Sequence, residues 1–135
     1  MPRLGMVARM NGPLPARIET ELAALGLGAA EPGLGGFLPP PKVAAAARAG
    51  LALRARHGRG GTTVGLARAE ALAARRSLDA REMRQAAGWF ARFACLADSK
   101  GWGDAARPST GWIAWQLWGG DEGRAWVEAE RSRWS

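Results

Sequence analysis

Residues 111–126 read GWIAWQLWGGDEGRAW, and together with Trp134 they hold five of the chain's seven tryptophans. Each buried aromatic side chain removes about 150–250 Å² from water, whereas much of the remaining apolar content is alanine. The tryptophans at 112, 115 and 118 recur at helical spacing, so we expect most of them to form the core. Trp134 is the tryptophan that we expect to be exposed and to bind a partner, because Trp is common in interface hot spots.

The composition favours an all-α fold. The chain has 135 residues, which is about one domain, and 47% of them are hydrophobic. Alanine is the best helix former, and β-branched residues are scarce in this sequence. We therefore expect a compact all-α bundle of about five helices over residues 42–135, preceded by an N-terminal arm over residues 1–41.

The arm is expected to contain one short helix and a linker. Leu14, Ile18, Leu22 and Leu25 repeat at intervals of four, four and three residues, which is one helical stripe. Residues 28–41 hold four Gly and four Pro, a composition typical of a linker. We expect the arm to contact a partner or a neighbouring subunit, with Ile18 and Leu22 as its partner-binding residues.

The first two helices after the linker are identified by their ends. Pro41 suits the first turn of a helix because its backbone has no N–H to satisfy, and Gly58 suits the end of that helix. Thr62 or Thr63 can cap the next helix, which we expect over about 64–75.

The following helix has the clearest start in the chain. Asp79 and Glu82 form a pair like a capping box, which predicts a helix over about 80–97. The boundaries of the last two helices are indicated by single residues or pairs. Ser109 or Thr110 precedes a fourth helix, Gly119 and Gly120 follow it, and Asp121 caps a last helix that extends to about 133.

Positive charge is concentrated in the middle of the chain. The formal net charge is +7, and residues 42–92 alone hold eleven basic and three acidic side chains, whereas residues 1–41 are net 0 and residues 93–135 are net −1. Such a segment is typical of proteins that bind a polyanion, most often nucleic acid. A GC-rich genome also favours arginine codons, and that interpretation stays open. The candidate polyanion-binding residues are Arg59, Arg68, Arg75, Arg76, Arg81 and Arg84.

Two local patterns each leave two interpretations. The glycine-rich turn at 58–61 precedes a capped helix, so it suits either a backbone-phosphate contact or a tight connection between helices. The helices over 64–75 and 80–97 suit either a helix-turn-helix, with Arg81, Arg84 and Gln85 near the bases, or phosphate binding without base reading.

Nothing in the sequence indicates an enzyme. His57 is the single histidine and Cys95 the single cysteine, so a zinc site lacks ligands, and we expect Cys95 to be a buried, inert thiol. We expect no cofactor, no metal and no small-molecule substrate. The sequence also lacks an apolar run of signal-peptide type or of membrane-spanning length, so we expect no membrane partner and a place in the cytoplasm at synthesis.

Several strings within residues 42–127 form a family pattern: RAGL at 48–51, GRGGT at 58–62, VGLARA at 64–69, FAR at 90–92, KGW at 100–102, IAW at 113–115, LWGGD at 117–121 and GRAW at 123–126. With them the chain resembles a small helical domain of tailed-phage and prophage proteins, and the WGGD segment is the most specific part. Similar proteins tend to carry His after the Phe-Ala-Arg string, where this chain has Phe93. The resemblance implies a phage context.

The sequence thus predicts a non-enzymatic phage virion protein, associated with the head or its connector. Its partners would be other virion proteins, DNA or both, with the basic middle of the chain facing DNA or an acidic protein surface. The alternative is a free DNA-binding accessory protein or regulator that uses the helices over 64–75 and 80–97.

Overall fold

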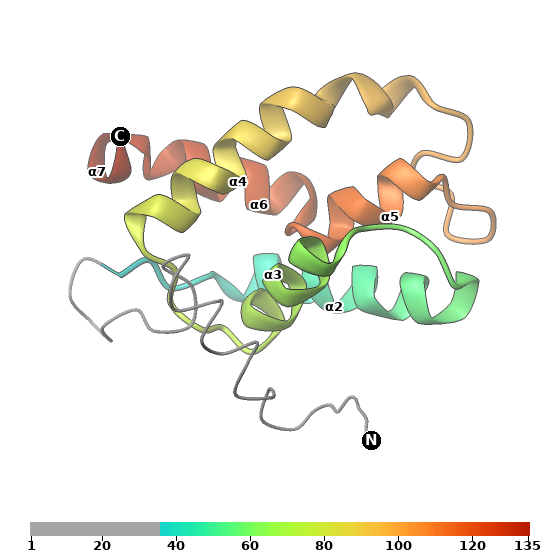
Figure 1. Ribbon diagram of the computed structural model, residues 1–135, viewed down its shortest axis with the longest axis horizontal. Helices are drawn as coiled ribbons and strands as arrows, with labels where there is room; N and C mark the ends of the chain where they lie inside the picture. The colour runs from blue at the N-terminus through green and yellow to red at the C-terminus, as the bar shows by residue number, and fades with distance from the viewer. Residues whose placement is uncertain (1–35) are drawn as a thin grey trace. The chain divides into compact units, whose positions relative to one another are not determined.

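The computed structural model describes residues 36–135, and this part of the chain is all-α (Figure 1). The predicted helix around Ile18 and Leu22 lies outside the described residues. Besides its helices, the described part holds a single β-bridge, between Phe37 and Leu78. The helices are α2 (Pro41–His57), α3 (Thr63–Ala73), α4 (Ala80–Phe93), the 3₁₀ helix η1 (Ala94–Asp98), α5 (Thr110–Leu117), α6 (Gly120–Ala129) and α7 (Arg131–Trp134).

The first helix boundaries lie where the local signals predict them. Pro41 is in the first turn of α2, and Gly58 ends that helix with φ +67°, donating its N–H to the Arg54 carbonyl. The side chain of Thr62 caps α3 by accepting from the N–H of Gly65. These two ends fix the short connection between α2 and α3.

The capping box of α4 is present in full. The Asp79 carboxylate accepts from the N–H of Glu82 at 2.8 Å, and the Glu82 carboxylate accepts from the N–H of Asp79 at the same distance. Two N–H groups that a helix start leaves unpaired are thereby satisfied. The α-helix ends at Phe93, earlier than predicted, and the chain continues as the 3₁₀ helix η1 to Asp98.

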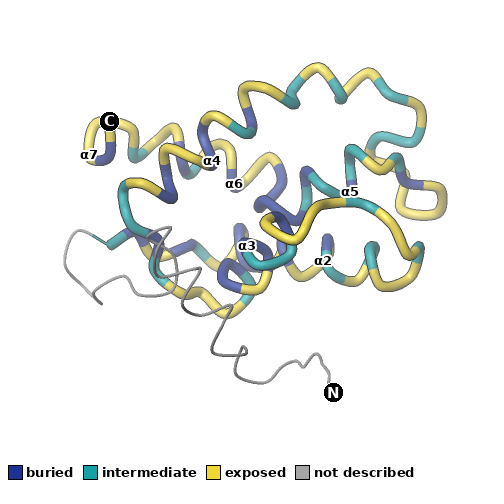
Figure 2. The backbone as a smooth tube through the Cα atoms, in the orientation of Figure 1, coloured by how far each residue is buried: buried dark blue, intermediate teal, exposed yellow. Residues whose placement is uncertain are grey.

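The core lies where α2 packs against α3, α5 and α6, and the buried stretches in Figure 2 face this centre. Ile113, Trp115, Leu117 and Trp118 of α5 and its C-cap are buried there. Gly50 lets α2 approach α5 closely, because a Cβ at Gly50 would lie 2.6 Å from the backbone nitrogen of Leu117. Trp115 and Trp118 therefore belong to the core as predicted, and Trp134, which was expected to be exposed, is buried as well.

The start of α6 differs from the prediction. Its N-cap is Gly119, with φ +112°, and Asp121 lies inside the first turn. The Asp121 carboxylate accepts instead from the indole N–H of Trp115 at 2.9 Å. The predicted single helix to 133 is interrupted at Glu130, whose backbone (φ −95°, ψ 6°) separates α6 from α7.

The compact part of the chain begins earlier than the predicted boundary at residue 42. Gly35–Ser135 forms one compact unit, and Phe37, with 3% of its surface exposed, and Pro39 belong to its core. The last residues of the predicted linker are therefore part of the domain, because Phe37 buries an aromatic ring beside the α3–α4 connection.

Candidate nucleic-acid interface

Four of the six predicted polyanion-binding arginines gather at one end of the domain, around the α3–α4 connection and the start of α4. These are Arg75, Arg76, Arg81 and Arg84, and we call this region the arginine end. All four are exposed residues. Figure 1 shows α7 and the segment that leads into α2 beside the start of α4.

Arg75 occupies an unusual backbone conformation. It lies in the left-handed region at φ +53°, the only non-glycine residue among those described that does so. The N–H of Arg75 donates to the carbonyl of Leu72, and that of Arg76 to the carbonyl of Ala71. This is the Schellman ending of a helix, with arginine at the position where glycine is usual.

Side-chain contacts connect this turn to its neighbours. The guanidinium of Arg75 donates through Nε to the Pro39 carbonyl at 2.7 Å. Arg84 donates to the carbonyl of Trp134 at 2.8 Å. The guanidinium of Arg133 lies 4.4 Å from the centre of the Phe37 ring. The arginine end is therefore one continuous region made from three separate parts of the chain.

The positive charge of this region is mostly uncompensated. None of its four arginines forms an ion pair with another described residue, whereas Arg131 and Arg133 of α7 pair with Glu128 and Glu130. Arg76 lies close enough to Glu70 to oppose the effect of burial, which raises the pKa of that carboxyl. An exposed group of cations without an ion pair among the described residues is an arrangement that suits phosphate binding.

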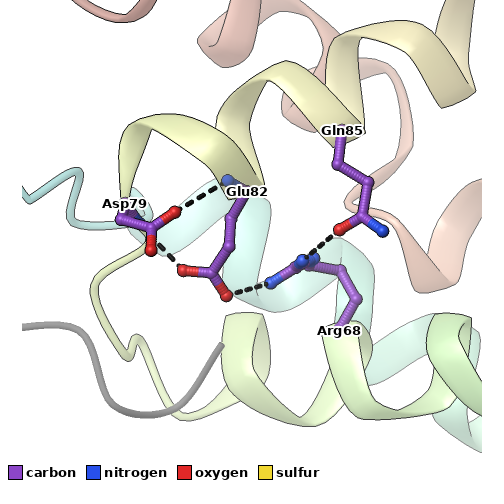
Figure 3. A network of polar contacts seen from close by, with 4 residues as sticks. All are labelled: Arg68, Asp79, Glu82 and Gln85. Atoms are coloured by element: carbon purple, nitrogen blue, oxygen red, sulfur yellow. Dashed lines mark hydrogen bonds and ion pairs between the residues drawn. The ribbon is translucent and has the colours of Figure 1, made fainter. Parts of the chain in front are cut away.

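Arg68 is a correction to the predicted site, because it lies inside the domain (Figure 3). Its guanidinium donates to the Glu82 carboxylate and to the side-chain oxygen of Gln85, each at 2.8 Å. The ion pair is almost completely buried, with 2% and 3% of the two side chains exposed. Arg68 therefore connects α3 to the capping box of α4 and is not available to a polyanion.

Trp134 is also a correction. It is buried, with 4% of its surface exposed, and its indole N–H donates to the carbonyl of Val127 at 2.7 Å. The guanidinium of Arg131 covers the ring at 4.6 Å. The side chain that we expected to bind a partner instead packs α7 onto the domain.

Arg59 lies away from the arginine end, in the connection that leads from α2 to α3. Two of its guanidinium nitrogens donate to the Pro108 carbonyl, at 2.9 and 3.3 Å. It lines a hollow of about 580 Å³ with Lys100, Asp104 and Arg107. The structure thus separates Arg59 from the other exposed candidates.

Packing accounts for two glycines of the turn at 58–61. Gly60 and Gly61 have φ +100° and +80°, and a Cβ on either would come within 2.4–2.6 Å of the Ile113 or Leu117 side chain. Because both positions are pressed against α5, this supports a tight connection between helices over a phosphate loop.

The structure does not bring together the residues that could take part in catalysis or metal binding. His57 is partly buried, and Cys95 is exposed, which corrects the expected buried thiol. Over residues 36–135 no group of three or more His, Cys, Asp or Glu side chains is placed to hold a metal ion. No helix in that part of the chain is both long and apolar enough to cross a membrane.

A groove that the sequence did not reveal lies between the start of α3 and the outer face of α4. It has a volume of about 510 Å³ and is lined by the apolar side chains of Val64, Trp89, Phe93 and Trp118 and by Arg84 and Arg92. We call it the α3–α4 groove. Only the aromatic residues at helical spacing could have indicated it, and we interpreted those as core.

The connection between α3 and α4 bears on the helix-turn-helix interpretation. It spans residues 74–79, between the end of α3 at Ala73 and the start of α4 at Ala80. The turn of a helix-turn-helix has about three or four residues, so this connection is longer.

No family model, no curated protein and no solved structure matches the chain.

Proposed function

We propose that the chain is a non-enzymatic, virion-associated protein of a tailed phage, located at the head or its connector, and that its arginine end binds DNA. The phage context rests on the resemblance of residues 42–127. The DNA-binding role rests on one observation: Arg75, Arg76, Arg81 and Arg84 are exposed together and form no ion pair with another described residue.

Electrostatics gives this proposal a quantitative form. Each phosphate that an arginine neutralises releases condensed counterions, so the logarithm of affinity falls with the logarithm of salt concentration by about 0.9 per contact. Four arginines at one end of the domain therefore correspond to a slope of about −3 to −4. Binding of this kind ignores base sequence.

Two features support contact with the DNA backbone over base reading by a free regulator. The α3–α4 connection is longer than a helix-turn-helix turn, and the side-chain oxygen of Gln85 is engaged by the buried Arg68. An acidic surface of another virion protein is the alternative partner for the same cations.

The test is a salt titration of binding to a random DNA duplex, measured by fluorescence anisotropy. The variant Arg76→Gln/Arg81→Gln removes two cations that have no hydrogen bond or ion pair among the described side chains. Its matched control, Arg56→Gln/Arg107→Gln, makes the same change in net charge away from the arginine end. We expect the first variant to lower the salt slope by about 2 and the control to leave it nearly unchanged.

Equal losses in the two variants would assign the binding to net charge alone and contradict a specific surface. The virion role is tested separately, by quantitative mass spectrometry of purified particles. A structural component should be present at a fixed number of copies per particle, and its absence from particles would exclude that role.

A further inference from the structure

The α3–α4 groove combines features that a solvated helix surface does not need. Val64 leaves 41% of its surface exposed at one side of the groove, and the part-buried rings of Trp89 and Phe93 line it. The ring of Trp89 stacks on that of Trp118, with 5.0 Å between the ring centres. The groove therefore has an apolar, aromatic wall.

Gly88 lies in the groove and has no packing reason to be glycine. It is an exposed residue inside α4, where glycine is less favourable than alanine, and a Cβ at this position would meet no atom within 4 Å. At Gly50, Gly60 and Gly61, by contrast, a Cβ would collide with a neighbour. Gly88 therefore leaves open space that a bound molecule can use to approach the helix backbone.

The polar groups of the groove offer hydrogen-bond donors. Arginine has only donors, so the Gln85 oxygen must face Arg68 and the Gln85 amide nitrogen points away from it, as Figure 3 shows. The Thr62 oxygen already accepts from the N–H of Gly65, which leaves its hydroxyl proton to donate. With Arg84 and Arg92, these groups favour a ligand rich in acceptors and negative charge.

The cations continue along one face of α4. Arg81, Arg84, Gly88 and Arg92 follow each other at intervals of three, four and four residues, which places them on one helical stripe. At a rise of 1.5 Å per residue the stripe is about 16 Å long. The stripe joins the groove to the arginine end without a carboxylate among the groove-lining residues.

We infer that the α3–α4 groove binds single-stranded DNA. Arg84 and Arg92 contact its phosphates, and an unpaired base enters over Gly88 and packs against the part-buried rings of Trp89 and Phe93, which lie 4.9 Å apart between centres. A cationic groove with aromatic side chains is the usual means of binding single strands without sequence preference. This inference rests on the proposed DNA-binding function and adds the form of DNA that the groove accepts.

The experiment compares a fluorescent twelve-residue oligothymidine with a random duplex of the same length, using the full chain. Gly88→Leu fills the groove without removing a charge, and Gly88→Ala, which adds one methyl group, is its matched control. We expect Gly88→Leu to weaken oligothymidine binding at least tenfold and to leave duplex binding within twofold. Tryptophan fluorescence of the wild-type protein should be quenched by the oligothymidine.

The remaining outcomes overturn the inference and separate it from the proposed function. Duplex binding without oligothymidine binding would leave the arginine end as a DNA site and remove the groove from it. Oligothymidine binding that Gly88→Leu does not weaken would place the single strand elsewhere. If oligoglutamate binds instead, and Gly88→Leu weakens that binding, the occupant is an acidic protein segment. A cooperative thermal unfolding transition of Gly88→Leu, at or above the wild-type temperature, shows that the variant is folded.

Discussion

Phe37 and Leu78, far apart in the sequence, exchange two main-chain hydrogen bonds, with N···O distances of 2.8 and 2.9 Å. This pair connects the segment before α2 to the α3–α4 connection, and both side chains are buried. Arg75 and Arg76 lie three and two residues before Leu78. The pairing therefore holds the arginine end in place.

Removing the Phe37 ring should destabilise the domain. Phe37→Ala leaves a cavity and is expected to cost about 3–5 kcal/mol of unfolding free energy. Leu38→Ala is the matched control, because Leu38 is 55% exposed and its loss should change stability by less than about 0.5 kcal/mol. Urea unfolding measures both, and equal effects would show that residues 36–40 are not part of the folded domain.

The left-handed backbone of Arg75 predicts a difference between two substitutions. Arg75→Ala loses the hydrogen bond to Pro39 and keeps the backbone strain, whereas Arg75→Gly loses the bond and relieves the strain. Since the left-handed conformation costs a non-glycine residue about 1 kcal/mol or more, Arg75→Gly should be the more stable variant by about that amount. If urea unfolding finds the alanine variant equal or more stable, the turn is not strained.

The buried ion pair of Arg68 and Glu82 predicts strong coupling. Arg68→Met alone leaves a buried carboxylate without its partner and should cost about 3–5 kcal/mol. The double variant Arg68→Met/Glu82→Gln removes the charge and keeps a side chain that can form the capping box. It should regain most of the lost stability in urea unfolding. A double variant less stable than Arg68→Met would mean that the network acts through packing alone.

Glu70 predicts a pH effect of definite sign. Burial raises the pKa of its carboxyl above the ordinary value of 4.5, against the opposing effect of Arg76. Between pH 4.5 and the raised pKa, the folded state holds the proton of Glu70 more tightly than the unfolded state does. The contribution of Glu70 to stability therefore falls as the pH rises through this window. Glu70→Gln should therefore be slightly more stable than wild type at pH 7, and the gain should be small because Glu70 is an exposed residue whose electrostatic interactions are screened by solvent.

Glu128 provides the opposite case. Its hydrogen bond from Arg131 lowers the pKa of the carboxyl, so its contribution is present above pH 4.5 and is lost as the pH falls through the lowered value. Thermal unfolding of Glu70→Gln and Glu128→Gln between pH 3 and 8 compares the two. A shift of the same sign in both variants would contradict these assignments.

Two glycines in helices should respond in opposite ways to the same substitution. Gly88→Ala gains helix propensity without a clash and should stabilise the domain by about 0.5–1 kcal/mol. Gly50→Ala makes the same change in propensity but places a methyl group 2.6 Å from the Leu117 nitrogen, so it should destabilise. Calorimetry measures both, and a loss of stability in Gly88→Ala would mean that this glycine serves the fold.

The sequence predicted those features whose cause is local. The helix ends at Pro41, Gly58, Thr62 and the Asp79–Glu82 capping box depend only on backbone groups a few residues away. These helix ends can therefore be predicted without knowledge of the fold. The prediction that Trp115 and Trp118 form part of the core was also correct, because large aromatic side chains offer more apolar area than the alanines around them.

The incorrect predictions depended on contacts between distant residues. Phe37 is buried because Leu78 is beside it, and Trp134 is buried because Val127 offers its carbonyl. In the sequence Arg68 resembles an exposed helix residue, but in the structure it forms hydrogen bonds with Glu82 and Gln85 of α4. The groove could not be predicted either, because its two walls come from different helices.

The change of winding after Phe93 has a practical consequence. In η1 the thiol of Cys95 is exposed, and it is the chain's single cysteine. It lies beyond the far end of α4 from Arg81, about 21 Å along the helix axis. A maleimide dye would therefore attach at one defined position, away from the arginine end, and energy transfer from it to labelled DNA would report which end of the molecule the nucleic acid occupies without any substitution in the chain.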